Sequence, residues 1–418
     1  MALIAFLMDV EEGHIIPSFG LATALKKNGH RVLYISVPDN EQIVSAQGFD
    51  FHPVFADVYP PGFNNAYKQQ RTGTEYHDHE QKEYFLGIVN GSLDEVFHLY
   101  NPDLLIVSAF LNLEALLLHY KYNIHPVIFT PFLRHKGSTS TEDCLHHIMK
   151  LQADTICGIT DYLQATGVRF SYLPALMKPL QKFTELVVCP AALEPDALLT
   201  GVNVHFIEPS IRREDRFTDV RDLHNATPGQ KIIYASLGSQ GITYGNACAD
   251  FFRLMILVMQ RPEMQHIHLI LAVGREFNTN TLGSIPGNIT IQPWVPQTVI
   301  MNIVSLVITH GGLGTIKESI CAGVPMIVFP IRNDQPHNAR IIAHHRLGAS
   351  LDLGAVTEAR LADTILEVLH SENIRDNIAA MQRVFRQAEK EQPGVALIES
   401  MLSDPMYKRS FSRFKSHS

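Results

Sequence analysis

Short apolar runs alternate with amphipathic stretches through the first half of the chain. Each apolar run has the length of a strand, and the stretches between them carry a helical period that stops at Gly29 and Gly48. This alternation predicts an α/β fold with a doubly wound parallel sheet. The predicted strands cover 2–8, 31–37, 49–54, 104–107 and 126–129, and the predicted helices cover 17–28 and 39–47.

The second half repeats this construction after a change in composition. The polar stretch before it contains Pro209, Pro228 and Gly229, which is typical of a linker. Two such domains leave a cleft between them, where ligands usually bind. The predicted organisation is a Rossmann-like domain over 1–207, a linker over 208–229, a second Rossmann-like domain over 230–387, and a helix with a basic tail over 388–418. The predicted elements of the second domain are strands at 231–237, 267–273, 289–291, 305–309 and 325–329, and helices at 246–260, 314–322, 335–346, 358–370 and 373–390.

Composition fits two domains and excludes some functions. The chain has 418 residues, more than one hydrophobic core normally serves, with 46% apolar and 18% charged residues. A formal net charge of −8 argues against nucleic acid as a partner, because phosphate-binding proteins present a basic surface. Five scattered cysteines without a CxxC pair favour neither a disulfide framework nor a zinc site.

The apolar N-terminus predicts a buried strand rather than a signal peptide, because no basic region precedes it. No apolar run reaches the length of a membrane span. We therefore expect a cytoplasmic protein, monomeric or homodimeric. Its contact with a membrane would be at most peripheral, through the basic residues 408–415.

A dense set of motifs begins at Trp294, the only tryptophan. Strand 305–309 is expected to deliver His310 to its carboxyl end, where a glycine-rich turn opens a helix near Gly314. A helix N-terminus presents N–H groups and a partial positive charge, so the turn predicts an anion site, most simply for a diphosphate. The full set is Trp294-Val295-Pro296-Gln297, Thr309-His310-Gly311-Gly312-Leu313-Gly314-Thr315-Ile316-Lys317-Glu318, Gly323-Val324-Pro325, Pro330 and Asp334-Gln335.

The side chains around this turn extend the predicted site. His310 and Thr315 add donors, Glu318 suits ribose hydroxyls, and Trp294 offers a flat ring on which a base can stack. Each has a simpler explanation when taken alone: a turn used for packing, a tryptophan in the core, a solvated Glu318, or Asp334-Gln335 as a helix start. Their joint spacing favours a nucleotide-sugar site.

In order and spacing these motifs resemble the signature of the UDP-glycosyltransferase family, GT-B-fold enzymes that glycosylate lipophilic small molecules. The 16-residue step from Trp294 to His310 resembles the bacterial macrolide and carotenoid branch rather than the plant branch. The resemblance implies two Rossmann-like domains that face each other across a cleft. It also implies inverting, metal-independent transfer of glucose or a related hexose to a hydroxyl of a small apolar acceptor. We expect a UDP-sugar as the co-substrate, and dTDP- and GDP-sugars stay open as alternatives because related enzymes that use them keep much of this pattern. No cofactor is expected.

The resemblance also implies roles for single positions. Trp294 stacks on the base, the backbone of Val295 pairs with the edge of the base, and Gln297 lies nearby. The implied partners of the diphosphate are His310, Gly312, Gly314, Thr315 and Ser239. Glu318 is the implied partner of the ribose, and Asp334 and Gln335 are those of the transferred sugar.

A candidate general base lies in the first domain. Gly13-His14-Ile15-Ile16-Pro17 follows the first strand, which puts His14 at the carboxyl edge of the sheet. Imidazole accepts a proton at neutral pH, although a histidine in this place is usually a loop or capping residue. Gly-His-x-x-Pro resembles the catalytic base motif of the family.

Position 108 departs from the family pattern. In the family an aspartate after a later strand orients the base, and the matching residue here is Ser108. A serine can orient an imidazole but brings no charge. Glu12, Asp9 and Glu114 are candidate substitutes, and the sequence does not place them. Phenolic or enolic acceptors would tolerate a weakened base better than alcohols.

Other interpretations stay open. A nucleotide-sugar epimerase or hydrolase can share this fold, and a non-catalytic nucleotide-sugar-binding relative would explain Ser108. His77-Asp78-His79 suggests a metal, but a loop without a regular ligand ladder favours no metal site. The expected acceptor-side segments are 57–85 and 134–180, whose aromatic residues suit a flat aglycone or a core equally well. These aromatic residues are Tyr59, Phe63, Tyr67, Tyr76, Phe85, Phe132, Tyr162 and Phe170.

Overall fold

The computed structural model divides into two compact units. The first comprises Met1–Ala191, Asp196–Ser210 and Glu391–Ser418, and the second comprises Ala192–Pro195 and Ile211–Lys390. The first unit therefore takes in both ends of the chain. The residues that the structure describes are 1–64, 76–134, 139–170, 172–195, 203–211, 224–238, 241–404 and 407.

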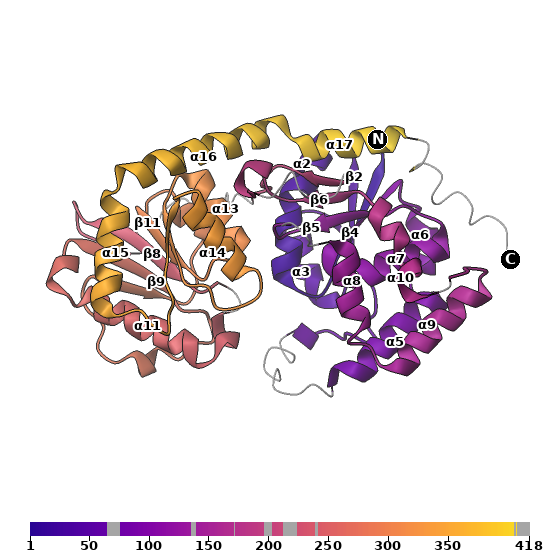
Figure 1. Ribbon diagram of the computed structural model, residues 1–418, viewed down its shortest axis with the longest axis horizontal. Helices are drawn as coiled ribbons and strands as arrows, with labels where there is room; N and C mark the ends of the chain where they lie inside the picture. Colours follow the sequence, from indigo (N-terminus) through magenta and orange to yellow (C-terminus); the bar gives the residue numbers. More distant parts are fainter. Residues whose placement is uncertain are drawn as a thin grey trace. The chain divides into compact units, whose positions relative to one another are not determined.

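The first unit is built on a seven-stranded, all-parallel sheet (Figure 1). The strand order β3-β2-β1-β4-β5-β6-β7 reverses direction between β1 and β4. Ligands bind such sheets outside the carboxyl ends of the strands at the reversal, so this order directs attention to the ends of β1 and β4. The strands are β1 (Leu3–Leu7), β2 (Arg31–Ser36), β3 (Asp50–Pro53), β4 (Leu104–Ser108), β5 (Val127–Thr130), β6 (Glu185–Val187) and β7 (Val204–Phe206).

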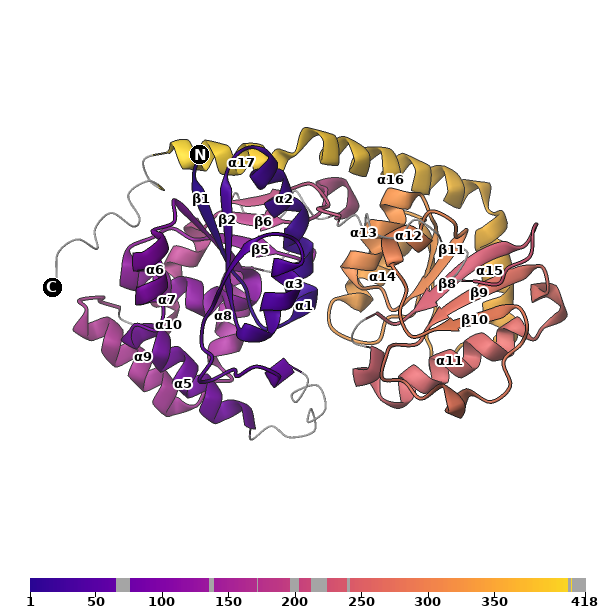
Figure 2. The same cartoon turned by 180° about the vertical axis from the view of Figure 1, so that it is seen from behind.

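Helices cover both faces of this sheet (Figures 1 and 2). β1 is buried on both faces, which explains its continuous apolar run. Ile4 and Phe6 pack in one core with α2 and α17, and Ala5 and Leu7 pack in another with α5 and α7. The helices are α1 (Glu12–Ile15), α2 (Phe19–Lys27), α3 (Glu41–Ser45), α5 (Tyr76–Asn90), α6 (Asp94–Tyr100), α7 (Asn112–Tyr122), α8 (Ser140–Ile148), α9 (Ala153–Ala165), α10 (Leu173–Leu176) and α17 (Pro393–Ser403).

The second unit contains a six-stranded, all-parallel sheet of order β10-β9-β8-β11-β12-β13, which reverses between β8 and β11. Its strands are β8 (Lys231–Ser236), β9 (Ile267–Ala272), β10 (Ile289–Gln292), β11 (Leu306–Thr309), β12 (Met326–Val328) and β13 (Gly348–Ser350). Its helices are α11 (Asn246–Met259), α12 (Gln297–Ile300), α13 (Leu313–Ala322), α14 (Gln335–His344), α15 (Glu358–His370) and α16 (Glu372–Glu391).

The predicted α/β class with parallel sheets is confirmed. Elements that the apolar pattern did not predict include β6, β7, β13, α6, α7 and α12. β6 begins with Glu185, a buried carboxylate that pairs with the Arg134 guanidinium. Because a charged residue is not expected in a core strand, the apolar pattern did not indicate β6. Within 57–85, one of the two segments expected on the acceptor side, α5 begins at Tyr76.

Candidate active site

Three polar side chains meet where β1 and β4 end. His14 Nδ1 lies 2.7 Å from Asp9 Oδ1, and Ser108 Oγ donates to Asp9 Oδ2 at 2.6 Å. Asp9 lies just beyond β1, Ser108 is the last residue of β4, and His14 belongs to the short helix α1. The serine that stands in place of the expected aspartate is therefore hydrogen-bonded to an aspartate from the neighbouring strand.

Buried polar groups hold Asp9 in place. Asn40 Nδ2 donates to the Asp9 carbonyl at 3.0 Å, and Ser36 Oγ donates to the Met8 carbonyl at 2.8 Å. The backbone N–H of Glu11 donates to Asp9 Oδ1 at 3.0 Å. Both the backbone and the carboxylate of Asp9 are thus fixed, as a site that must orient another side chain requires.

The surroundings of Asp9 favour its charged form. Burial raises the pKa of Asp9, but the charge and hydrogen bond of His14, with the Ser108 hydrogen bond, outweigh burial and keep this pKa below its ordinary value. An ionised carboxylate only accepts hydrogen bonds, so His14 carries a proton on Nδ1. In the neutral ring the lone pair is then on Nε2, which is the nitrogen that can accept a proton.

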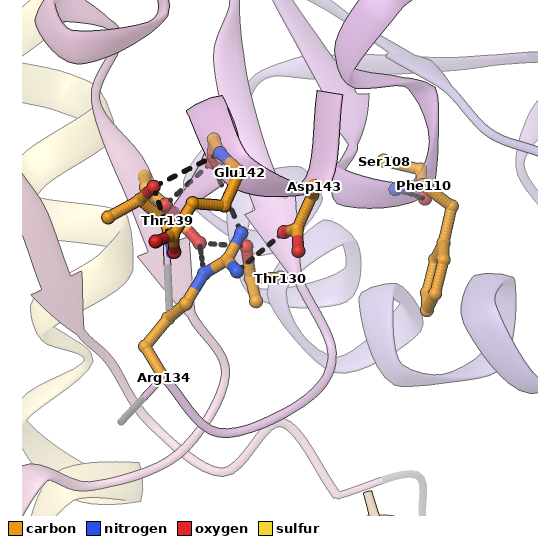
Figure 3. Close-up of polar contacts among 9 residues, drawn as sticks. Ser108, Phe110, Thr130, Arg134, Thr139, Glu142 and Asp143 are labelled. Atoms are coloured by element: carbon orange, nitrogen blue, oxygen red, sulfur yellow. Dashed lines mark hydrogen bonds and ion pairs between the residues drawn. The ribbon is translucent and has the colours of Figure 1, made fainter. Parts of the chain in front are cut away.

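An aromatic wall stands beside His14. The Phe110 ring stacks on the imidazole with centroids 3.6 Å apart, and the Phe132 ring lies 5.3 Å from Phe110. The Arg134 guanidinium lies 4.8 Å from the Phe132 ring and donates to Asp143 Oδ2 at 2.6 Å (Figure 3). Because Arg134 is fully buried, its ion pairs fix the loop after β5 that carries Phe132.

A mainly apolar cavity of about 160 Å³ lies next to Asp9 in the first unit. Its walls come from the loops after β1, β2 and β3 and from α5, α7 and α8. Its apolar lining includes Leu7, Val37, Val54, Phe55, Phe85 and Phe110, and its polar lining includes Tyr59, Tyr84, Glu114 and His147. Such a cavity beside a proton acceptor suits a small lipophilic molecule that bears a hydroxyl group.

The three candidate carboxylates have different places. Asp9 contacts His14 directly, whereas Glu12 is exposed in the first turn of α1. Glu114 is buried in the first turn of α7 and lines the cavity. Asp9 is therefore the carboxylate partner of His14.

In the second unit, predicted site residues lie where β8 and β11 end, at the point where this sheet reverses direction. His310 directly follows β11, and its ring packs between two glycines. A Cβ at Gly238 would lie 2.6 Å from His310 Cε1, and one at Gly312 would lie 2.8 Å from His310 Nε2. Side chains at either position would displace the imidazole. Gly238 was not among the predicted site residues, although it directly precedes Ser239, which was.

Hydrogen-bond donors suited to an anion lie around His310 and the start of α13. Burial lowers the pKa of His310 to about 4, so the imidazole is neutral at pH 7 and offers a hydrogen bond rather than a charge. Gly312 is the N-cap of α13 and provides no side-chain cap, which leaves the N–H groups of the first turn to other partners. A Cβ at Gly314 would meet nothing within 4 Å, so this side of the turn is open.

Gln297 connects two residues on one face of α13. Its Nε2 donates to Thr315 Oγ1 at 3.0 Å and to Glu318 Oε2 at 2.5 Å. The Tyr234 hydroxyl donates to Gln297 Oε1 at 3.3 Å. The structure therefore brings Gln297, predicted to lie near the base, into contact with Thr315 and Glu318, the residues predicted for the diphosphate and the ribose.

Trp294 is a surface residue rather than a core one. Its side chain is 43% exposed, and the Arg275 guanidinium lies 5.7 Å from its ring. The neighbouring Val295 is buried. The exposed ring and the buried neighbour Val295 are compatible with the predicted stacking on a base, and this role stays a prediction.

The two residues predicted to hold the transferred sugar make contacts within the second unit. Gln335 Oε1 accepts from the backbone N–H groups of Ile331 and Arg332, and its Nε2 donates to the Tyr244 hydroxyl at 3.0 Å. Asp334 Oδ2 accepts from Asn338 Nδ2 at 2.8 Å. Their roles toward a sugar stay predictions. No motif in the sequence pointed to Tyr244 or Asn338.

The structure does not describe every residue for which the sequence made a prediction. Ser239 lies outside the described residues, as does the basic tail 408–415. Within the described part of the chain, no three His, Cys, Asp or Glu side chains are grouped so that they could hold a metal ion. None of the described helices is long and apolar enough to cross a membrane.

Comparison with known proteins identifies the family. Residues 274–394 match the family described as UDP-glucoronosyl and UDP-glucosyl transferase. The NDP-glycosyltransferase YjiC of Bacillus subtilis is 25% identical over 396 residues, which cover 93% of this chain and 95% of that protein. Residues 274–394 therefore belong to the UDP-glycosyltransferase family. The chain is a nucleotide-sugar glycosyltransferase.

Other glycosyltransferases resemble the chain along nearly its whole length. The oleandomycin glycosyltransferase of Streptomyces antibioticus is 25% identical over 410 residues, with 96% of this chain and 91% of that protein covered. A crystal structure of the glycotransferase of kitacinnamycin has a TM-score of 0.77 at 23% identity and covers 96% of this chain and 99% of that one. The predicted GT-B fold and the relation to the bacterial macrolide branch are confirmed.

Proposed function

We propose that this glycosyltransferase moves a hexose, most simply glucose, from a UDP-sugar to a hydroxyl of a small lipophilic natural product, with inversion at the anomeric carbon. The observation that carries the proposal is the hydrogen-bonded series His14–Asp9–Ser108 beside an apolar cavity. The family description supports a UDP-sugar, and the name of the oleandomycin enzyme supports a natural-product acceptor.

His14 acts as the general base in this proposal. Its Nε2 takes the proton of the acceptor hydroxyl while the acceptor oxygen bonds to the anomeric carbon. The bond from that carbon to the diphosphate oxygen breaks in the same step, and nucleoside diphosphate leaves. Asp9 holds the proton on Nδ1 and stabilises the imidazolium that forms. A single displacement inverts the configuration.

The second unit binds the donor and its leaving group. The N–H groups at the start of α13 and the neutral His310 donate hydrogen bonds to the diphosphate, which gains charge as it leaves. Trp294 stacks on the base, Val295 pairs with its edge, and Gln297 positions Glu318 toward the ribose. Asp334 and Gln335 hold the sugar, and Ser239 adds a donor to the diphosphate. No metal takes part in this scheme.

Catalysis is favoured over a purely binding role for a specific reason. The binding role rested on the serine at 108, which suggested a base without a charged partner. Asp9 supplies that charge from the adjacent strand. A hydrolase or epimerase can use a base, but it has no lipophilic acceptor to bind and so no need for an apolar cavity beside that base.

A donor and acceptor screen tests the proposal. UDP-, dTDP- and GDP-glucose are each incubated with a panel of phenols and alcohols, and products are identified by mass spectrometry. We expect glycosides from UDP-glucose, a loss of at least about 100-fold with His14→Ala, and unchanged rates with His98→Ala, a substitution of an exposed histidine in α6.

Three outcomes would contradict parts of the proposal. Product formation by His14→Ala at the wild-type rate would remove the base assignment. Release of free sugar or an epimer without acceptor would favour a hydrolase or epimerase. Nucleotide binding without turnover across the panel would favour a binding protein.

A further inference from the structure

Two carboxyl groups of the first unit line the same cavity but differ in their surroundings. Asp9 is tied to His14 and Ser108. Glu114 is only 2% exposed, and its Oε2 has no hydrogen-bond partner among the described residues. The proposed chemistry uses the first carboxyl and leaves the second without a role.

The surroundings of Glu114 keep it protonated. Burial raises the pKa of Glu114 to about 8, and the charge of Asp9 acts in the same direction against the hydrogen bond from Tyr84. The thiol of Cys144, whose pKa burial raises to about 12, brings no charge from α8 at neutral pH. Burial also lowers the pKa of His147, so α8 adds a neutral ring. Among the described residues that line the cavity, none is Lys or Arg.

A protonated carboxyl is a hydrogen-bond donor, unlike a carboxylate. When a purely apolar ligand fills the cavity, a buried donor without a protein partner loses any water that would accept its hydrogen bond. A ligand that brings an oxygen acceptor to this point keeps the bond. Sites of this kind discriminate strongly against analogues that lack the partner atom.

We propose that Glu114 determines acceptor specificity by donating a hydrogen bond to a carbonyl oxygen of the acceptor, so that the cavity selects apolar hydroxyl compounds that also carry a carbonyl group. This inference rests on the proposed function of the cavity as the acceptor site. Glu114 stands beside the reacting hydroxyl rather than acting on it. The base remains His14. The charged Asp9 orients this base, and the neutral Glu114 binds the acceptor.

A matched pair of phenols tests this role. 4-(4-Hydroxyphenyl)butan-2-one and 4-butylphenol differ only by a carbonyl group in place of one methylene. Their dissociation constants are measured by titration calorimetry at pH 7 on the wild-type chain and on Glu114→Gln and Glu114→Leu. The preference is the ratio of the butylphenol constant to the ketone constant.

The two variants separate a donor from an anion. Glutamine keeps a neutral N–H donor, so Glu114→Gln should retain the wild-type preference within about threefold. Leucine removes the donor, so Glu114→Leu should lower the preference about tenfold, or about 1.4 kcal/mol, while butylphenol affinity changes less than threefold. The butylphenol affinity also reports that each variant is folded.

Several results would overturn the inference. It fails if wild type and Glu114→Leu show the same preference, if Glu114→Gln behaves like Glu114→Leu, or if wild type binds neither phenol. Sugar transfer is measured separately with UDP-glucose. A preference that follows Glu114 without any transfer supports this inference and contradicts the proposed function, whereas transfer to both phenols at a ratio indifferent to Glu114 does the opposite.

Discussion

Asp9 accepts a hydrogen bond from Ser108 across the two strands at which the first sheet reverses direction, with 2.6 Å between Oδ2 and Oγ. The other carboxylate oxygen of Asp9 meets His14 Nδ1. Compared with the family pattern, the carboxylate has moved from the end of β4 to the loop after β1, and a serine hydroxyl now supports it. The proposed base His14 keeps a charged partner, so the reason for expecting a preference for phenols over alcohols disappears.

Removing the charge of Asp9 should be costly. We expect Asp9→Asn to lower kcat/KM for the best acceptor by about 10²- to 10⁴-fold, because an amide stabilises no imidazolium and can reverse the ring tautomer. Ser108→Ala removes one hydrogen bond but leaves the charge, so a loss of about tenfold or less is expected. Steady-state kinetics on both variants measure the difference.

Exchanging the two residues is the matched control. The double variant Asp9→Ser with Ser108→Asp restores one carboxylate and one hydroxyl in the family arrangement, and should recover part of the activity that Asp9→Ser loses. Ser108→Asp alone puts two carboxylates in contact and should be impaired. If Asp9→Asn keeps more than half of the wild-type rate, Asp9 is not the partner of the base.

Gly314→Ala should separate binding from folding. A Cβ at this position meets no protein atom within 4 Å, and alanine favours a helix over glycine by up to about 1 kcal/mol. The melting temperature should therefore stay the same or rise. UDP affinity should fall about tenfold, because the methyl group occupies the side of α13 that the diphosphate approaches. Equal UDP affinity in wild type and Gly314→Ala would show that no phosphate approaches there.

Much of the fold and of the site in the second unit could be predicted from the sequence because these features depend on local patterns. Continuous apolar strands and glycine stops predicted most strands of both sheets, and the motifs from Trp294 to Gln335 indicated the family. The contact between Asp9 and Ser108 joins residues 99 positions apart and depends on the strand order, which no local pattern encodes. β6 was not predicted for a related reason, because the ion pair of Glu185 with Arg134 is visible only in three dimensions.

Glu114 should make stability depend on pH. Its pKa is raised from 4.5 to about 8 on folding, so the unfolded chain loses this proton first. The stability linked to Glu114 is fully present below pH 4.5 and falls as pH rises to about 8. Urea unfolding of wild type and Glu114→Gln should therefore diverge over this range in favour of the variant. A difference between them that is constant from pH 5 to 8 would contradict the raised pKa.

His310 should show the opposite dependence. Its pKa is lowered from 6.5 to about 4 in the folded chain, so the unfolded chain takes up this proton first. The stability linked to a neutral His310 is present above pH 6.5 and is lost as pH falls toward 4. Relative to His310→Gln, the wild-type free energy of unfolding should decrease over that range.

A bound diphosphate favours the imidazolium, so UDP should bind wild type progressively more tightly than His310→Gln as pH falls from 7 to 5. If the ratio of the two UDP affinities does not change with pH, the imidazole does not contact the diphosphate. Gly238 and Gly312 would then serve only to pack the ring.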